Sequence, residues 1–115
     1  MDISKSNKNW KCKVCVFSGR PDPVWKPSEK VVLNLLDIIE KAHPVSIPYK
    51  LPEGLGYRGL CLFSNETLIT AYHGLIYISD GDLKDVRKDE NLRFYGYFIN
   101  HLPKKFDFLK VTIMD

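Results

Sequence analysis

Three short apolar runs separated by tight turns constrain the fold of this chain more than any other feature. They are LCLFS, LITAYHG and LIYIS, at residues 60–64, 68–74 and 75–79. Asn65-Glu66 and the neighbourhood of His73-Gly74 carry residues that suit hairpin turns. The runs therefore predict two or three short antiparallel strands.

Two further strands are expected near the ends of the chain. The segment 11–18, KCKVCVFS, is apolar on both faces from Val14 onward, which favours an interior strand. The segment 106–114, FDFLKVTIM, alternates and predicts a final strand.

Two segments have helical periodicity. In 28–43, seven apolar residues recur on one face, Ser28 is a suitable N-cap, and Pro44 ends the helix. The segment 89–102 repeats the pattern, with Asp89 as a candidate cap.

The expected fold class is α+β: one small domain over residues 11–115, a mostly antiparallel sheet with two helices packed on it. The polar segment 80–91 is expected to form a turn or a helix. The segment 4–13, SKSNKNWKCK, holds four lysines with little hydrophobic pattern, and residues 1–10 are expected to form a frayed N-terminus.

Composition excludes several classes of function. The chain has 115 residues and a formal net charge of +3, with its lysines dispersed, so no nucleic-acid binding is expected. No apolar run could span a membrane and no export signal is visible, so three cysteines indicate a reduced, cytoplasmic protein. Nothing in the sequence predicts a metal or another cofactor.

Two stiff loops carry the candidate binding residues. The first, VFSGRPDPVWKPS at 16–28, contains Arg20, Asp22 and Trp25, and the second, at 44–59, contains Tyr57 and Arg58. Guanidinium groups bind carboxylates or phosphates, and the aromatic rings can stack on a ligand. The alternative is structural: Arg20 pairs with Asp22, Trp25 fixes the loop over a helix, and Tyr57 fills the edge of the core.

These loops also carry a resemblance. VFSGRPDPVW and GLGYRGL are similar to the SGRPNPxW and LGYRGF motifs of a set of small, uncharacterised, mostly bacterial proteins. The order of elements over the first two thirds of the chain is similar too. The sequence departs from these motifs at Asp22, where asparagine is expected, and at Leu60, where phenylalanine is expected. The resemblance implies that both loops belong to one scaffold, and it implies no activity.

Other motifs favour structural interpretations. Cys12 and Cys15 form a C-x-x-C within a predicted strand, where they face opposite sides, so inert buried thiols are expected. The G-x-G-x-x-G spacing of Gly54, Gly56 and Gly59 follows a proline-rich loop and precedes a strand, which is the wrong context for a dinucleotide site.

The leading functional hypothesis is a non-catalytic domain that presents the two loops to a partner protein or a small anionic ligand. One alternative is a small enzyme acting on an anionic substrate, with His73 and Asp22 or Asp82 as acid and base. Another is a homo-oligomeric structural protein with an interface of exposed tyrosines, namely Tyr77, Tyr95 and Tyr97.

Overall fold

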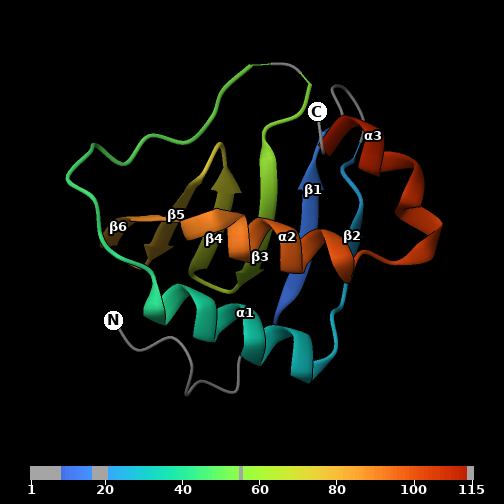
Figure 1. The fold of residues 1–115 in the computed structure, drawn as a ribbon, viewed down its shortest axis with the longest axis horizontal. Coiled ribbons are helices and arrows are strands. Elements are labelled where there is room, and N and C mark those ends of the chain that lie inside the picture. Colours follow the sequence, from blue (N-terminus) through green and yellow to red (C-terminus); the bar gives the residue numbers. More distant parts are fainter. Residues whose placement is uncertain (1–8, 17–20, 55, 114–115) are drawn as a thin grey trace.

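The computed structural model describes residues 9–16, 21–54 and 56–113, and within them the fold is α+β (Figure 1). A six-stranded antiparallel sheet has the order β2-β1-β3-β4-β5-β6. Its strands are β1 Lys11–Cys15, β2 Val24–Trp25, β3 Gly59–Ser64, β4 Thr67–Tyr72, β5 Leu75–Asp80 and β6 Leu83–Lys88.

Three α-helices accompany the sheet, one more than the sequence predicts: α1 Glu29–Lys41, α2 Arg93–Asn100 and α3 Lys110–Ile113. Two short 3-10 helices, η1 Glu90–Leu92 and η2 Lys104–Leu109, precede α2 and α3. Figure 1 shows α1 and α2 lying across the same face of the sheet. An Asn34 Nδ2–H donates to Tyr97 Oη over 2.7 Å and joins the two helices.

The predicted hairpins are confirmed. Asn65 (φ 46°) lies in the turn from β3 to β4, and His73 and Gly74 (φ 50° and 80°) form the turn from β4 to β5. In the His73-Gly74 turn both central residues have positive φ, which matches the twist of the strands and favours a tight hairpin. The N-cap of α1 is confirmed as well, because Ser28 Oγ accepts a hydrogen bond from Val31 N–H.

Two predicted elements differ in the structure. The segment 80–91 has the predicted turn at Gly81-Asp82, but it continues as edge strand β6, in which Val86 alone is buried. An edge strand tolerates charge and needs little alternation, so its pattern is weak. The predicted strand over 106–114 is helical through its described residues, because Leu109 and Ile113 bury one turn apart.

The hydrophobic core lies between the sheet and the helices. Leu35 of α1, Phe94 of α2 and the sheet residues Leu60, Ile69 and Ile76 are fully buried there. Trp10 joins this core with 6% of its surface exposed, although the sequence pattern placed it in the frayed segment; residues 1–8 lie outside the described part.

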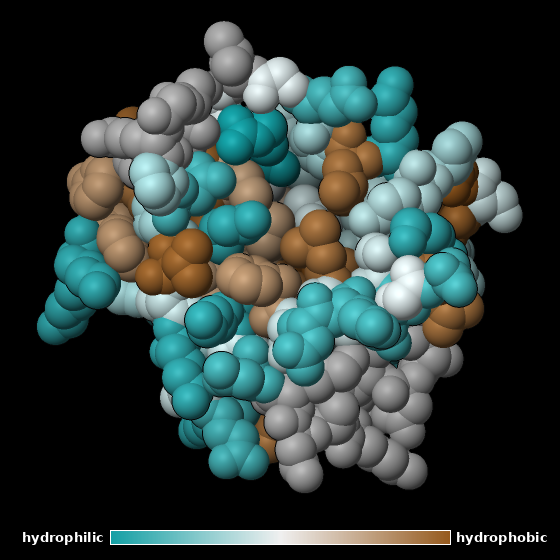
Figure 2. Space-filling model, turned by 180° about the vertical axis from the view of Figure 1, so that it is seen from behind, coloured by the Kyte–Doolittle hydropathy of each residue, from teal (hydrophilic) through white to brown (hydrophobic). Residues whose placement is uncertain are grey.

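The opposite face of the sheet has no helix among the described residues. Residues 43–54 partly cover it: Val45 N–H donates to Val86 O at 2.9 Å, and the Tyr49 ring packs edge-on against the Tyr77 ring with centroids 6.0 Å apart. Figure 2 views this side and shows apolar residues gathered in the middle of the face with polar groups around them. No helix within the described ranges is long and apolar enough to cross a bilayer.

Candidate functional site

The two predicted loops meet on the helix-free face of the sheet. Asp22 of the first loop and Arg58 of the second face each other, with Oδ2 and Nη2 3.6 Å apart. Asp22 Oδ1 also accepts a hydrogen bond from Val16 N–H at 2.9 Å. The Arg58 backbone N–H donates to Cys15 O at 2.6 Å, so the second loop is anchored to the end of β1.

Arg58 also holds its own loop in shape. Its Nη1 donates to Gly56 O at 2.7 Å and reaches Gly54 O at 3.4 Å. The guanidinium is thus fixed in one orientation, with 24% of the side chain exposed. A cation held in this way is prepared for a ligand, since little side-chain freedom remains to be lost on binding.

A pocket of about 250 Å³, here called the junction pocket, lies where the loops meet the sheet. Its polar lining comes from Lys13, Cys15, Asp22, Arg58, Cys61 and Thr70, and its apolar lining from Leu51, Pro52 and Leu68. Lys13, Cys61 and Thr70 share a face because they pair in register across β1, β3 and β4.

Two thiols lie side by side in this pocket. The Sγ atoms of Cys15 and Cys61 are 3.3 Å apart, and Cys61 Sγ lies 3.5 Å from Thr70 Oγ1. The hydrogen bond from Cys61, aided by the positive charge of Lys13, lowers the pKa of Cys15 to about 7, although burial and Asp22 act in the opposite direction. The same hydrogen bond and burial raise the pKa of Cys61.

Cys12 behaves differently from Cys15. It faces the core, with 2% of its surface exposed, and burial raises its pKa to about 12. The expectation of an inert buried thiol therefore holds for Cys12. Cys15 departs from it because its strand position turns it to the helix-free face, where it is only partly buried. No group of three or more histidine, cysteine or acidic side chains in the described ranges is arranged to hold a metal ion.

The aromatic residues of the two predicted loops lie elsewhere. Trp25 pairs with Cys12 in the sheet and packs against Phe98 and Phe106, with ring centroids 5.8 and 5.5 Å away. Its ring is therefore part of the core on the helix side. Arg20 lies outside the described residues.

Tyr57 turns toward the helices as well. Its hydroxyl hydrogen-bonds to the hydroxyl of Tyr95, and its ring lies 5.8 Å from that of Tyr72. Burial raises the pKa of Tyr57 well above its ordinary range, so it remains a neutral phenol. The structure thus brings together Asp22 and Arg58 from the predicted set, and it places Trp25 and Tyr57 against the core.

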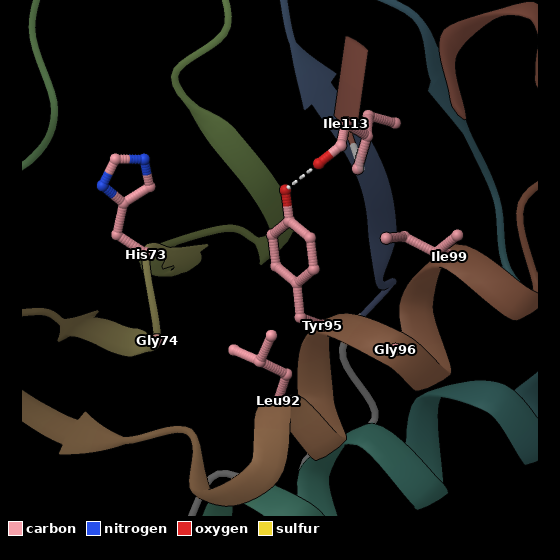
Figure 3. Close-up of a pocket in the computed structure, with 7 residues that line it drawn as sticks. All are labelled: His73, Gly74, Leu92, Tyr95, Gly96, Ile99 and Ile113. Atoms are coloured by element: carbon pink, nitrogen blue, oxygen red, sulfur yellow. Dashed lines mark hydrogen bonds between the residues drawn. The ribbon is translucent and has the colours of Figure 1, made fainter. Parts of the chain in front are cut away.

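A second pocket, of about 340 Å³, lies on the helix side (Figure 3). Apolar atoms of Leu92, Ile99 and Ile113 line it, and Tyr95 donates its hydroxyl to Ile113 O at 2.8 Å. His73 lies at its rim and points away from Tyr95 in Figure 3. The imidazole is stacked on Tyr72 with ring centroids 3.9 Å apart.

His73 is separated from its proposed acidic partners. Asp22 lines the junction pocket on the other face of the sheet. Asp82 lies in the turn that follows β5. Strand β5 begins beside His73 and has six residues, so His73 and Asp82 lie near opposite ends of a strand that is roughly 20 Å long at the usual rise per residue. The geometry does not bring His73, Asp22 and Asp82 into one site.

Sequence reasoning missed Lys13, Cys15, Cys61 and Thr70 as parts of the site. All four lie in predicted strands, on the face of the sheet that no described helix covers, but the alternation of apolar and polar residues along a strand does not reveal which strands are neighbours.

Comparison of the chain with protein-family models, with curated proteins and with solved structures gives no match.

Proposed function

We propose that this chain is a non-catalytic binding domain whose junction pocket holds a small anionic ligand. The observation that carries the proposal is the convergence of the two loops on one pocket, where Asp22 orients Arg58 beside a second cation, Lys13. Pockets whose polar groups are held in place by other contacts are typical of ligand sites.

The charge balance of the pocket favours an anion. Among the described lining residues, Lys13 and Arg58 contribute two positive charges and Asp22 one negative charge, which leaves one positive charge in excess while Cys15 is a thiol. The Thr70 hydroxyl offers a further hydrogen bond. A carboxylate or phosphate would be held by charge-assisted hydrogen bonds, which are about twice as strong as neutral ones.

The size of the pocket favours a small molecule over a protein segment. Its volume of about 250 Å³ is below the usual range of drug-sized ligand pockets. Leu51, Pro52 and Leu68 provide an apolar wall, which suits a short aliphatic or aromatic group attached to the anion.

The other two functional hypotheses have less support. The enzyme hypothesis needs His73 beside an acidic partner, and the two candidate partners lie elsewhere, as described above. The oligomer hypothesis needs exposed tyrosines, but each of the three is partly buried and has a partner within the chain: Tyr77 with Tyr49, Tyr95 with Tyr57 and Tyr97 with Asn34.

The proposal is tested by an amide NMR titration with acetate, butanoate, succinate and phosphate, using acetamide and butanamide as uncharged controls. We expect saturable shifts at Lys13, Cys15, Cys61 and Thr70 with at least one anion and none with either amide. Lys13→Gln should weaken binding about tenfold or more, since a hydrogen bond to a charged group contributes about 1.5–3 kcal/mol.

Arg93→Gln is the matched control, because it removes an exposed positive charge on α2, away from the pocket. It should leave the affinity unchanged. Shifts that are spread over the surface, or that weaken equally in Lys13→Gln and Arg93→Gln, would show only general charge attraction and would contradict the proposal.

A further inference from the structure

The facing thiols of the junction pocket form an arrangement that ligand binding does not explain. Cys15 ends β1, and Cys61 lies in β3, 46 residues later in the chain. In the sheet Cys15 pairs with Gly59 and Lys13 pairs with Cys61, so the two cysteines are diagonal neighbours on the same face. Because Gly59 has no side chain, the Cys15 side chain can lean toward Cys61, and the Sγ atoms come within 3.3 Å.

The two thiols have unequal environments. Cys15 is partly exposed to the pocket, whereas Cys61 has 3% of its surface exposed and is backed by Thr70. The charged groups around Cys15 are Lys13 and Arg58, which favour the thiolate, and Asp22, which opposes it. Cys15 thus has the accessible and more acidic thiol, and Cys61 has the shielded one.

We infer that Cys15 and Cys61 are a peroxide-reactive dithiol, in which Cys15 is the attacking thiol and Cys61 the resolving thiol. In the first step the Cys15 thiolate attacks one oxygen of a hydroperoxide, the O–O bond breaks, and Cys15 becomes a sulfenic acid while the other oxygen leaves as water or an alcohol. In the second step Cys61 Sγ attacks Cys15 Sγ, and the sulfenic oxygen leaves as water. Two thiols are oxidised to one disulfide and one peroxide is reduced.

The structure allows this bond with a small movement. The sulfur atoms must approach from 3.3 Å to the disulfide length of about 2.05 Å. Cys15 is the last residue of β1, so it can shift toward Cys61 while the pairs at Cys12, Lys13 and Val14 remain. Cys12 faces the core on the other side of the sheet and takes no part.

This inference is independent of the proposed ligand. Peroxide needs only access to Cys15, and the pocket provides that access whether or not it also binds an anion. An anion bound at Lys13 would shield Cys15 and slow the reaction, so the two properties can be measured separately.

The test is oxidation of the purified, reduced protein with a slight excess of hydrogen peroxide, followed by intact mass and peptide mapping. We expect the loss of two hydrogen atoms, one free thiol remaining at Cys12, and a Cys15–Cys61 cross-link that dithiothreitol reverses. Three free thiols after treatment, or a cross-link that includes Cys12, would overturn the inference.

Variants separate the two roles. In Cys61→Ser, Cys15 should still be oxidised, but its sulfenic acid should persist and be trapped by dimedone. Cys12→Ser should give the same cross-link as the wild type.

The rate of alkylation of Cys15 should rise about tenfold per pH unit below pH 7 and level off above it, as expected for a thiol with a pKa of about 7. A profile that levels off only above the range of an ordinary cysteine would refute the assignment of Cys15 as the attacking thiol. If Cys61→Ser does not fold, the wild-type mapping still decides whether the pair forms.

Discussion

Replacing Asp22 by asparagine tests how the two loops are joined. Two contacts of Asp22 can be separated: Oδ1 accepts a hydrogen bond from Val16 N–H at 2.9 Å, and Oδ2 lies 3.6 Å from Arg58 Nη2. Asparagine keeps an oxygen for Val16 and removes the charge opposite Arg58. Because asparagine has nearly the same size and shape as aspartate, we expect Asp22→Asn to fold.

The two contacts predict different losses of stability. The side chains of Asp22 and Arg58 are 16% and 24% exposed, so their long ion pair should contribute about 1 kcal/mol or less. A hydrogen bond to a charged acceptor contributes about 1.5–3 kcal/mol. Asp22→Asn loses the ion pair and leaves Val16 N–H a neutral acceptor, so it should lower the free energy of unfolding by about 1–2 kcal/mol. Asp22→Ala loses both contacts and should lower it by about 2–4 kcal/mol, measured by urea denaturation.

The same variant should change the chemistry of Cys15. The Asp22 carboxylate raises the pKa of Cys15, so its removal should lower that pKa and shift the midpoint of Cys15 alkylation below about pH 7. Glu53→Gln is the control, since it removes an exposed acid elsewhere in the second loop and should leave both readouts unchanged. An upward shift of the midpoint, or an Asp22→Asn variant as unstable as Asp22→Ala, would refute the reasoning.

Three further predictions concern the scaffold. Asp89 is 4% exposed, and its carboxylate accepts hydrogen bonds from the N–H groups of Phe94 and Tyr95 at 2.8 and 3.0 Å. Asp89→Ala should therefore lower the free energy of unfolding in urea by about 2–3 kcal/mol, and Asp89→Asn clearly less. Equal losses would contradict the role of Asp89 as a cap of α2. Gly59→Ala should destabilise the protein by about 1–3 kcal/mol, because φ of Gly59 is +120° and an added Cβ would lie 2.9 Å from Ala71 O. Gly96 lies within α2, where an added Cβ would meet open space, so Gly96→Ala should stabilise the protein by up to about 1 kcal/mol. The reverse order of the two stabilities would refute the argument. Burial raises the pKa of Cys12 to about 12 in the folded protein, so the thiol ionises at a lower pH in the unfolded chain than in the folded one. The free energy of unfolding should therefore fall between about pH 9 and 12, and Cys12→Ala should reduce this slope by about 1.4 kcal/mol per pH unit. An unchanged slope would show that Cys12 is not responsible.

Locally determined elements could be predicted from the sequence. Helix α1 carries its own cap at Ser28 and an apolar face that repeats every turn, and the hairpins carry residues that accept positive φ at Asn65 and His73. Each of these signals lies within a few residues of the element it specifies. The residues of such elements favour one local conformation, although tertiary packing supplies most of the stability of the element.

Elements whose stability comes from distant contacts could not be predicted in this way. Strand β6 buries only Val86 and forms because β5 offers a free edge. The segment 104–113 is rich in residues that favour strands, yet Leu109 and Ile113 reach the core from successive helical turns. In both cases tertiary packing outweighs the local preference.

The junction pocket has the same origin, and this explains which of its residues the sequence revealed. Asp22 and Arg58 stood out because they lie in unusual, proline- and glycine-rich loops. Cys15 stood out only as part of a C-x-x-C with Cys12, and its proximity to Cys61 was not predicted. Cys15 and Cys61 become neighbours only when β1 pairs with β3 in a register that sets Lys13 opposite Cys61. A shift of that register by one residue would turn one thiol toward the core and abolish the pair. The chemistry of the pocket therefore depends on the pairing of the strands. Gly59 lets β3 begin close beside β4 and leaves room for the Cys15 side chain, so it determines the site as much as the charged groups that line the pocket.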